Sequence, residues 1–191
     1  FMKRTTPVGI SNKHLHLAQK DLDVLFGAGY KLTPIKDLGQ PGQYACDETV
    51  EVVGPKGSFK KVRVLGPVRS ETQVELAFTD AIQIGVNPPV RVSGDLEGTP
   101  GITLVGPAGK VDLERGVIVA CRHIHIDPAT ATEYGIKDKD IVSIKIDGPR
   151  GMILNEVLMR VREDFALEMH VDTDEGNAAM LKNSQILEIL K

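Results

Sequence analysis

The chain of 191 residues is long enough to bury a substantial core in one large domain or two small ones. Its hydrophobic content of 41%, charged content of 26% and net charge of -3 are typical of a soluble globular protein and argue against a general nucleic-acid binder. No apolar segment approaches the roughly 20 residues of a membrane-spanning helix, and no signal peptide is visible. Two cysteines, Cys46 and Cys121, are too few for a disulfide framework. We therefore expect a cytoplasmic protein that binds neither nucleic acid nor membranes.

Short runs rich in Val, Ile and Leu alternate with turns that contain Gly and Pro, which is typical of a mainly β protein. In chain order the pattern predicts a helix at residues 18–27, strands at 49–54, 60–66, 72–77, 90–94, 101–106 and 115–120, a helix at 127–135, strands at 141–146, 151–161 and 166–172, and a helix at 175–183. The segments ETVEVVGPKGSFKKVRVLGP and GITLVGPAGKVDLE are predicted hairpins. So many strands and so little helix favour β-barrels capped by short helices.

Two segments of the chain resemble each other. Residues 8–32 and 117–141 each contain an apolar run, a basic residue, a His-x-His motif and a predicted short helix that ends at glycine. This internal repeat favours two related β-barrel domains. We place the first at residues 13–116 and the second at residues 117–191.

All five histidines lie in three short motifs. His14 and His16 belong to SNKHLHL, His123 and His125 to CRHIHIDP, and His170 to LEMHVDTDE. Residues i and i+2 of a β-strand point to the same face about 7 Å apart, so two such imidazoles can reach one metal ion. The apolar residues that alternate with them can pack in a core. For one pair alone, surface histidines on a half-exposed strand are the alternative, but the repetition of the motif favours metal binding.

Each histidine pair needs a further ligand, because catalytic zinc normally takes three protein ligands and keeps one open position. His170 is the candidate third nitrogen for one site. The neighbouring Asp172, Asp174 and Glu175 are candidates to orient imidazole rings.

The segment GPVRSETQVEL supplies candidates for the other site. Its acidic residues are Glu71 and Glu75, and Glu75 lies in an apolar strand, where a carboxylate is costly unless it is paired or bound to metal. In the same segment Arg69 is a candidate anion receptor, since a guanidinium binds phosphate through two hydrogen bonds. A solvated surface arginine is the alternative interpretation of Arg69.

Five motifs in the same order resemble the PduL-type phosphotransacylases of bacterial microcompartments, the phosphate propanoyltransferases. The motifs are SNKHLHL, LGPVRSETQVEL, RVSGDLEGTPGITLVGP, ACRHIHIDP and EMHVDTDEGNAA, and they cover nearly the whole chain. The resemblance implies two β-barrel domains with a metal site between them, and a second barrel completed by the N-terminal strand at residues 5–12. It also implies an acyltransferase that moves a propanoyl or acetyl group reversibly between coenzyme A and phosphate.

The resemblance further implies two zinc ions per chain, each held by three residues. His14, His16 and Glu75 would hold the first ion, and His123, His125 and His170 the second. Arg69 would be a catalytic residue that binds the phosphate. The implied partners are acyl-CoA or CoA, phosphate or acyl phosphate, and a second copy of the chain in a homodimer. The lumen of a bacterial microcompartment is the alternative to a free cytoplasmic location.

We expect the phosphate to attack the thioester directly, without an acyl-cysteine intermediate. Cys46 has no histidine nearby in the sequence, and the imidazoles next to Cys121 are expected to be metal ligands. Two other functions compete with this interpretation. A zinc-dependent hydrolase of esters or phosphoesters would also use clustered metal ions. A non-catalytic binding module is suggested by residues 125–146, which resemble the strand–helix–strand unit of double-psi barrels.

Overall fold

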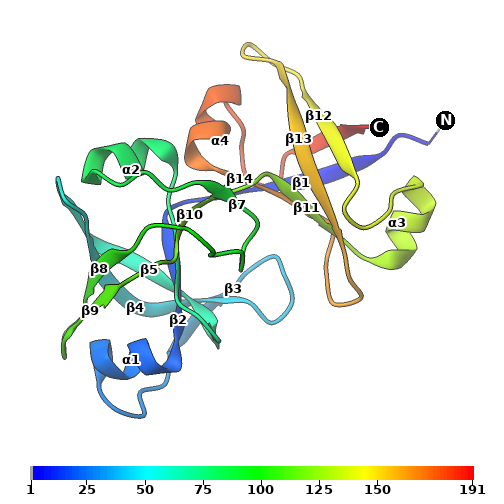
Figure 1. Cartoon of the computed structure of the whole chain (residues 1–191). Helices are drawn as coiled ribbons and strands as arrows, with labels where there is room; N and C mark the ends of the chain where they lie inside the picture. Colours follow the sequence, from blue (N-terminus) through cyan, green and yellow to red (C-terminus); the bar gives the residue numbers. More distant parts are fainter. Residues whose placement is uncertain (1) are drawn as a thin grey trace. The chain divides into compact units, whose positions relative to one another are not determined.

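The structure is a computed structural model of the chain, and it describes residues 2–191 (Figure 1). The described residues are mainly in β-strands and form two compact units. The barrel unit contains the described residues up to Ser11, residues 39–41 and residues 121–191. The sheet unit contains residues 12–38 and 42–120. The mainly β fold predicted from the sequence is confirmed.

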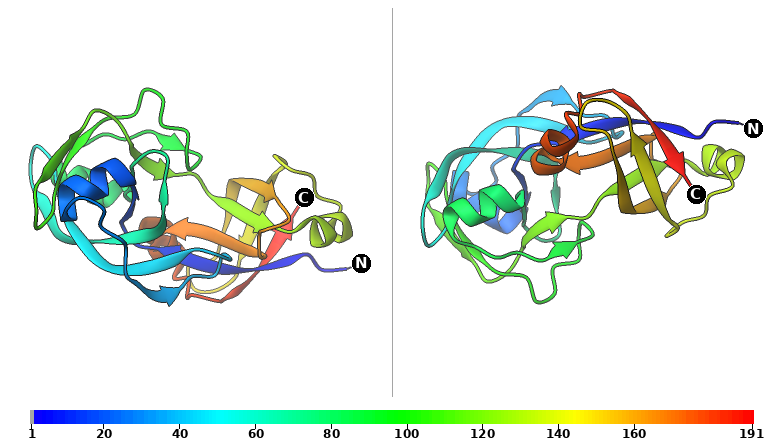
Figure 2. Two further views of the ribbon diagram at one scale, coloured as in Figure 1. Left: turned by 90° about the horizontal axis from the view of Figure 1, so that it is seen from below. Right: turned by 90° about the horizontal axis from the view of Figure 1, so that it is seen from above.

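The barrel unit is a closed six-stranded barrel. Its strands follow one another around the barrel in the order β1 (Thr5–Ser11), β14 (Glu168–Asp172), β11 (His123–Ile126), β13 (Met152–Val161), β12 (Ile141–Ile146) and β15 (Ile186–Leu190). Both views of Figure 2 show β1, in blue, running beside β14, in orange, and the two strands pair in parallel. The N-terminal strand thus lies in the same sheet as strands from the last third of the chain.

The barrel encloses a continuous apolar core. Val8, Ile124, Ile126, Met159 and Met169 are each 1% exposed or less. Because side chains alternate along a strand, the two isoleucines of HIHI point into this core and leave the histidines on the other face of β11. Burial of these side chains stabilises the barrel by about 1.5–3 kcal/mol for each large residue.

The sheet unit is built on one curled nine-stranded sheet. Its hydrogen-bonded order is β7 (Val90–Arg91), β10 (Val117–Ala120), β6 (Gln73–Glu75), β2 (His14–Ala18), β5 (Ser58–Arg69), β4 (Tyr44–Val53), β8 (Ile102–Val105) and β9 (Lys110–Leu113), and β3 (Pro34–Asp37) pairs with β4. The predicted hairpins are present, since β4 pairs with β5 and β8 with β9, both antiparallel.

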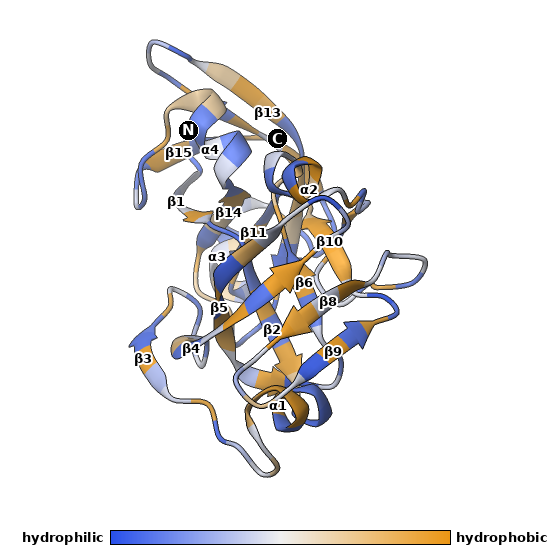
Figure 3. Ribbon diagram, turned by 90° about the vertical axis from the view of Figure 1, so that its left-hand side faces the viewer, coloured by the Kyte–Doolittle hydropathy of each residue, from blue (hydrophilic) through white to orange (hydrophobic). Residues whose placement is uncertain are grey.

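The core of the sheet unit is equally apolar. Figure 3 shows hydrophobic residues along β2, β8 and β10. Leu15, Leu17, Val64, Val74 and Leu104 are all fully buried in this core. The leucines of HLHL therefore anchor β2, as the alternating pattern predicts, while the two histidines lie on its opposite face.

The described residues contain four short helices, which are α1 (Gln19–Phe26), α2 (Phe78–Ile84), α3 (Pro128–Tyr134) and α4 (Thr173–Ala179). Three of them lie where the sequence predicts helices. In α3, Asp127 accepts a hydrogen bond from the Thr130 backbone N–H at 3.0 Å, and Gly135 ends the helix with a left-handed φ of 64°. None of these helices is long and apolar enough to cross a membrane.

The limits of the two units differ from the predicted domain limits. Strand β10 pairs with β6 and β7 and so belongs to the sheet unit, although the sequence places residue 117 at the start of the second domain. The division into domains at residues 13–116 and 117–191 stays a prediction.

Candidate metal centres

The first cluster of candidate ligands lies in the sheet unit. His14 and His16 come from β2, and Glu75 comes from β6, which pairs antiparallel with β2. Each of the three residues offers one donor atom, and these atoms lie within 4.8 Å of one another. The side chains of His14, His16 and Glu75 are 11%, 5% and 15% exposed. The strands thus bring two imidazoles and one carboxylate together in a nearly buried position.

Hydrogen bonds fix the orientation of the His14 ring. Its Nδ1 lies 2.8 Å from the carbonyl oxygen of Asn12, which can only accept, so Nδ1 carries the proton. The other ring nitrogen, Nε2, lies 3.1 Å from Oε2 of Glu75, and Nε2 of His16 lies 3.7 Å from Oε1 of the same carboxylate. The three residues therefore direct donor atoms at one another, as ligands of a single ion do.

The two imidazoles of this cluster differ in proton affinity. Burial lowers the pKa of His14, but the charge of Glu75 and the hydrogen bond to it outweigh burial, so the pKa is raised overall. Burial and the neighbouring His14 lower the pKa of His16 to about 3. His16 is therefore neutral at physiological pH, which is the state in which an imidazole binds metal.

Polar side chains around Glu75 form a network that includes Arg69. The Nη1 of Arg69 donates to Oγ of Ser93 at 2.9 Å, and Nε2 of Gln73 donates to the same Oγ at 3.0 Å. The positive charge of Arg69 opposes protonation of both histidines in the cluster, as a minor contribution to their pKa values. The sequence indicates Arg69 but not Gln73 or Ser93, which carry no motif signal of their own.

The second cluster lies in the barrel unit. His123 and His125 come from β11, and His170 comes from the antiparallel neighbour β14. Their donor atoms also lie within 4.8 Å of one another. The centroid of the His170 ring lies 5.2 Å from that of His123 and 5.0 Å from that of His125. The structure thus brings together the three histidines that the sequence predicts to share an ion.

Two features of this cluster parallel the first. Nδ1 of His123 donates to the carbonyl oxygen of Cys121 at 2.8 Å, as Nδ1 of His14 does to the carbonyl two residues before it. Burial, followed by the neighbouring His123, lowers the pKa of His125 to about 2. Nδ1 of His125 is buried and has no hydrogen-bond partner among residues 2–191.

These donor sets fit zinc. Neutral imidazole nitrogens and a carboxylate oxygen are ordinary zinc ligands, and three protein ligands are typical of a catalytic site. A buried imidazole nitrogen without a partner loses a hydrogen bond on folding, and a metal ion in the cluster would offset part of that cost. The geometry therefore supports one ion in each cluster, and the identity of the ligands stays a prediction.

In the second cluster, Glu168 is an acidic residue that contacts an imidazole. Its Oε1 accepts a hydrogen bond from Nε2 of His170, and this bond is the main reason why the pKa of Glu168 is lowered. Asp172 instead accepts from the backbone N–H of Glu175 at the start of α4, and Glu175 pairs with Arg122 at 2.7 Å. The structure thus gives Asp172 and Glu175 partners other than an imidazole.

Glu71, the other acidic candidate for the first site, lies elsewhere. Its carboxylate pairs with Arg115 at 2.7 Å, and both side chains are more than 40% exposed. The hydrogen bond from Arg115 lowers the pKa of Glu71. Of the two acidic candidates in the segment, Glu75 alone is in the cluster.

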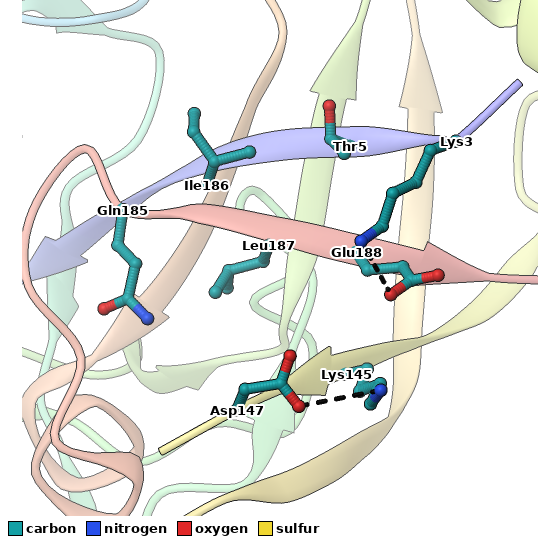
Figure 4. Close-up of a pocket in the computed structure, with 8 residues that line it drawn as sticks. All are labelled: Lys3, Thr5, Lys145, Asp147, Gln185, Ile186, Leu187 and Glu188. Atoms are coloured by element: carbon teal, nitrogen blue, oxygen red, sulfur yellow. Dashed lines mark ion pairs between the residues drawn. The ribbon is translucent and has the colours of Figure 1, made fainter.

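A surface pocket of the barrel unit lies away from these residues (Figure 4). It is lined by the ends of β1, β12 and β15, and two ion pairs span 3.4 Å (Lys3–Glu188) and 3.6 Å (Lys145–Asp147). None of its eight lining residues belongs to either cluster. The pocket therefore gives no support to a catalytic role.

Comparison with known proteins identifies the family. The family model described as phosphate propanoyltransferase matches residues 7–182. A protein of Thermotoga maritima named phosphate propanoyltransferase is 61% identical over 185 residues, which are 96% of this chain and 88% of that protein. Proteins of the same name from Rhodopseudomonas palustris and Enterococcus faecalis are 50% and 47% identical, over 96% and 99% of this chain and 81% and 90% of their own lengths.

The family match includes every residue of the two clusters, and the three relatives are matched over 81% to 90% of their own lengths. The resemblance drawn from the five sequence motifs is thereby confirmed. The chain belongs to the phosphate propanoyltransferase family of acyltransferases.

Proposed function

We propose that this chain transfers a short acyl group, propanoyl or acetyl, reversibly between coenzyme A and inorganic phosphate, with one zinc ion in each of the two clusters. The names of the relatives support the acyl and phosphate specificity. The proposal that each cluster binds a zinc ion rests on the two three-residue clusters themselves. Each contains a buried imidazole that is neutral at physiological pH.

The reaction must bring an anionic nucleophile to a thioester carbonyl and release a thiolate. Bound zinc supplies a Lewis acid, which stabilises negative charge on oxygen and lowers the pKa of a thiol from its usual value of about 8.5. Arg69 then has two tasks in this proposal. Its guanidinium holds phosphate through paired hydrogen bonds, and its positive charge offsets the repulsion between phosphate and Glu75.

In this reaction, a phosphate oxygen attacks the carbonyl carbon of the thioester directly. The C–S bond then breaks, and its electron pair leaves with the sulfur of coenzyme A. A cysteine nucleophile is not needed. Burial, followed by the charge of Glu48, raises the pKa of Cys46 to about 11, so its thiol stays protonated near neutrality. Cys121 contributes its backbone carbonyl to hold His123. We infer that neither thiol carries the acyl group.

A metal-quantified assay tests the proposal. Coenzyme A release from acetyl-, propanoyl- and lactoyl-CoA is measured at several phosphate concentrations, and acyl phosphate is measured in parallel. We expect release that depends on phosphate, one acyl phosphate for each coenzyme A, and about two zinc ions per chain. Release without phosphate would support a hydrolase instead. A protein that contains no zinc and turns over no acyl-CoA would support a binding module.

Location and assembly belong to the same proposal. We propose a cytoplasmic homodimer, with the lumen of a bacterial microcompartment as the alternative location. Light scattering of the purified protein tests the dimer, and co-fractionation with microcompartment shells tests the location.

A further inference from the structure

The two clusters are built on the same arrangement of three strands. In the sheet unit, β2 lies between β5, which is parallel to it, and β6, which is antiparallel. In the barrel unit, β11 lies between β13, which is parallel to it, and β14, which is antiparallel. In both units the central strand carries His-x-His and the antiparallel strand carries the third candidate ligand. Positions in the two units can therefore be compared one by one.

The register of the strands agrees as well. In the sheet unit, Glu75 pairs with His14, and Gln73, two residues earlier on β6, pairs with His16. The third ligand is thus opposite the first histidine of the motif. The residue two positions before it is opposite the second histidine.

The barrel unit repeats this register. His170 pairs with His123, and Glu168, two residues earlier on β14, pairs with His125. Gln73 and Glu168 therefore occupy equivalent positions, although their chemistry differs. Each is separated from the third ligand of its own cluster by one residue, and so shares a strand face with it.

Each of these two residues hydrogen-bonds to the third ligand beside it. Nε2 of Gln73 donates to Oε1 of Glu75 at 2.6 Å. Glu168 accepts from Nε2 of His170. An amide donor thus stands beside the carboxylate, and a carboxylate acceptor stands beside the imidazole. The supporting residue matches the hydrogen-bonding character of the ligand that it contacts.

Gln73 is itself held in place. It is 1% exposed, and its Oε1 accepts a hydrogen bond from the backbone N–H of Gly94 at 2.8 Å. Its Nε2 also donates to Oγ of Ser93. With three hydrogen bonds on one buried amide, only one orientation satisfies all partners, and that orientation directs the N–H at Glu75.

Glu168 is held by the loop that contains Gly39 and Gln40. A Cβ added at Gly39 would lie 2.6 Å from both carboxylate oxygens of Glu168, so a larger residue there would force this carboxylate to move. Gln40 is 7% exposed, donates to the carbonyl oxygen of Ala166 at 2.9 Å and accepts from the N–H of Ala166 at 3.2 Å. The loop thereby leaves space for the side chain of Glu168 and holds the backbone just before it.

We propose that Gln73 and Glu168 are matched positioning residues, which orient Glu75 and the ring of His170 for a metal ion before the ion arrives. The inference rests on the proposed function only in taking the two clusters as zinc sites. Groups that orient metal ligands typically contribute about 10- to 100-fold to metal affinity. Gly39 would act through Glu168, by leaving space for its carboxylate.

The experiment measures zinc affinity by competition with a chromogenic chelator, in proteins that keep a single cluster. His16→Ala leaves the barrel cluster, and His125→Ala leaves the sheet cluster. In the first background we expect Glu168→Ala to weaken zinc binding about 10- to 100-fold, and Glu168→Gln to weaken it less, because the glutamine oxygen can still accept from His170. In the second background we expect a comparable loss for Gln73→Ala. Glu163→Gln and Gln83→Glu, at exposed positions, serve as controls.

Gly39→Ala tests the same idea without removing any ligand or supporting side chain. We expect it to weaken zinc binding at the barrel cluster and to leave the sheet cluster unchanged. Gly57→Ala is the matched control, because a Cβ at Gly57 would lie 3.5 Å from its nearest neighbour. Circular dichroism checks that the variants are folded.

The outcomes separate the two proposals. A wild-type protein that binds no zinc would overturn the metal centres themselves. If the single-cluster proteins bind zinc but Glu168→Ala, Gln73→Ala and Gly39→Ala bind it as tightly as their backgrounds, the metal centres stand and the positioning role is refuted.

Discussion

The protonation of His125 leads to a prediction about acid stability of the metal-free protein. The side chain is buried, and the residue is 8% exposed. Burial, then the neighbouring His123, lowers its pKa to about 2, whereas an imidazole in an unfolded chain has a pKa of about 6.5. The folded protein therefore keeps this ring neutral at pH values where the unfolded chain protonates it. The free energy of unfolding must fall as the pH drops below the unfolded value.

The size of this effect follows from the two pKa values. Between about pH 8 and about pH 5.5, protonation of this ring in the unfolded chain alone removes about 1.4 kcal/mol of stability. This loss of stability hardly depends on the pKa of His125 in the folded state, provided that this pKa lies well below 5.5. At about pH 4.5 the loss would reach about 2.7 kcal/mol.

Urea unfolding of the chelator-treated protein measures the effect, with circular dichroism at the two pH values. The comparison is with His125→Gln, which keeps a polar side chain that does not titrate. We expect the variant to lose about 1.4 kcal/mol less than the wild type on acidification. Equal losses in the two proteins would show that His125 is protonated in the folded state or exposed to water, and would refute the argument.

Three further predictions concern the reaction. His123→Ala should lower the zinc content by about one ion per chain and abolish turnover, because a zinc site with two protein ligands is weak; unchanged zinc content by mass spectrometry would contradict the assignment. Arg69→Lys should raise the KM for phosphate at least about tenfold and that for acyl-CoA much less, whereas Arg115→Lys, at an exposed ion pair, should change neither constant. Cys46→Ala should keep near wild-type turnover, and the turnover of Cys121→Ala should fall only as far as the packing around the substituted side chain is disturbed. An acyl group detected on Cys121 by mass spectrometry would contradict direct transfer.

The sequence predicts the histidine strands correctly because their pattern is local. The period of two in HLHL and HIHI places leucine or isoleucine on one face and histidine on the other, and the structure buries Leu15 and Ile124 completely. The start of α3 is also local, since Asp127 caps the helix within three residues. The sequence misses α2, whose N-cap residue Ala77 offers no capping side chain.

The supporting residues could not be predicted from local patterns. Glu168 contacts Gly39 across 129 positions of sequence, and nothing near either residue indicates that they meet. Ser93 joins the network around Glu75 from a turn after a two-residue strand. These contacts depend on the pairing of distant strands, and the composition of a segment does not specify its partner.

The common architecture of the clusters makes the chemical difference between their third residues informative. Both place His-x-His beside an antiparallel strand, but the third residue is the carboxylate of Glu75 in one cluster and the imidazole of His170 in the other. With a divalent ion in each, the three candidate ligands of the sheet cluster would leave one net positive charge and those of the barrel cluster two, and the carboxylate of Glu168 beside His170 would offset part of the latter charge. The barrel cluster would then attract an anion more strongly, and the sheet cluster would release a bound thiolate more easily. Under the proposed function, the lower charge of the sheet cluster suits the exchange of a thiol. Glu75→His replaces the carboxylate of the sheet cluster by an imidazole. It should therefore impair coenzyme A release more than phosphate binding, and pre-steady-state kinetics of the two steps can measure this difference. An equal effect on both steps would show that the charge of Glu75 does not favour release of the thiol.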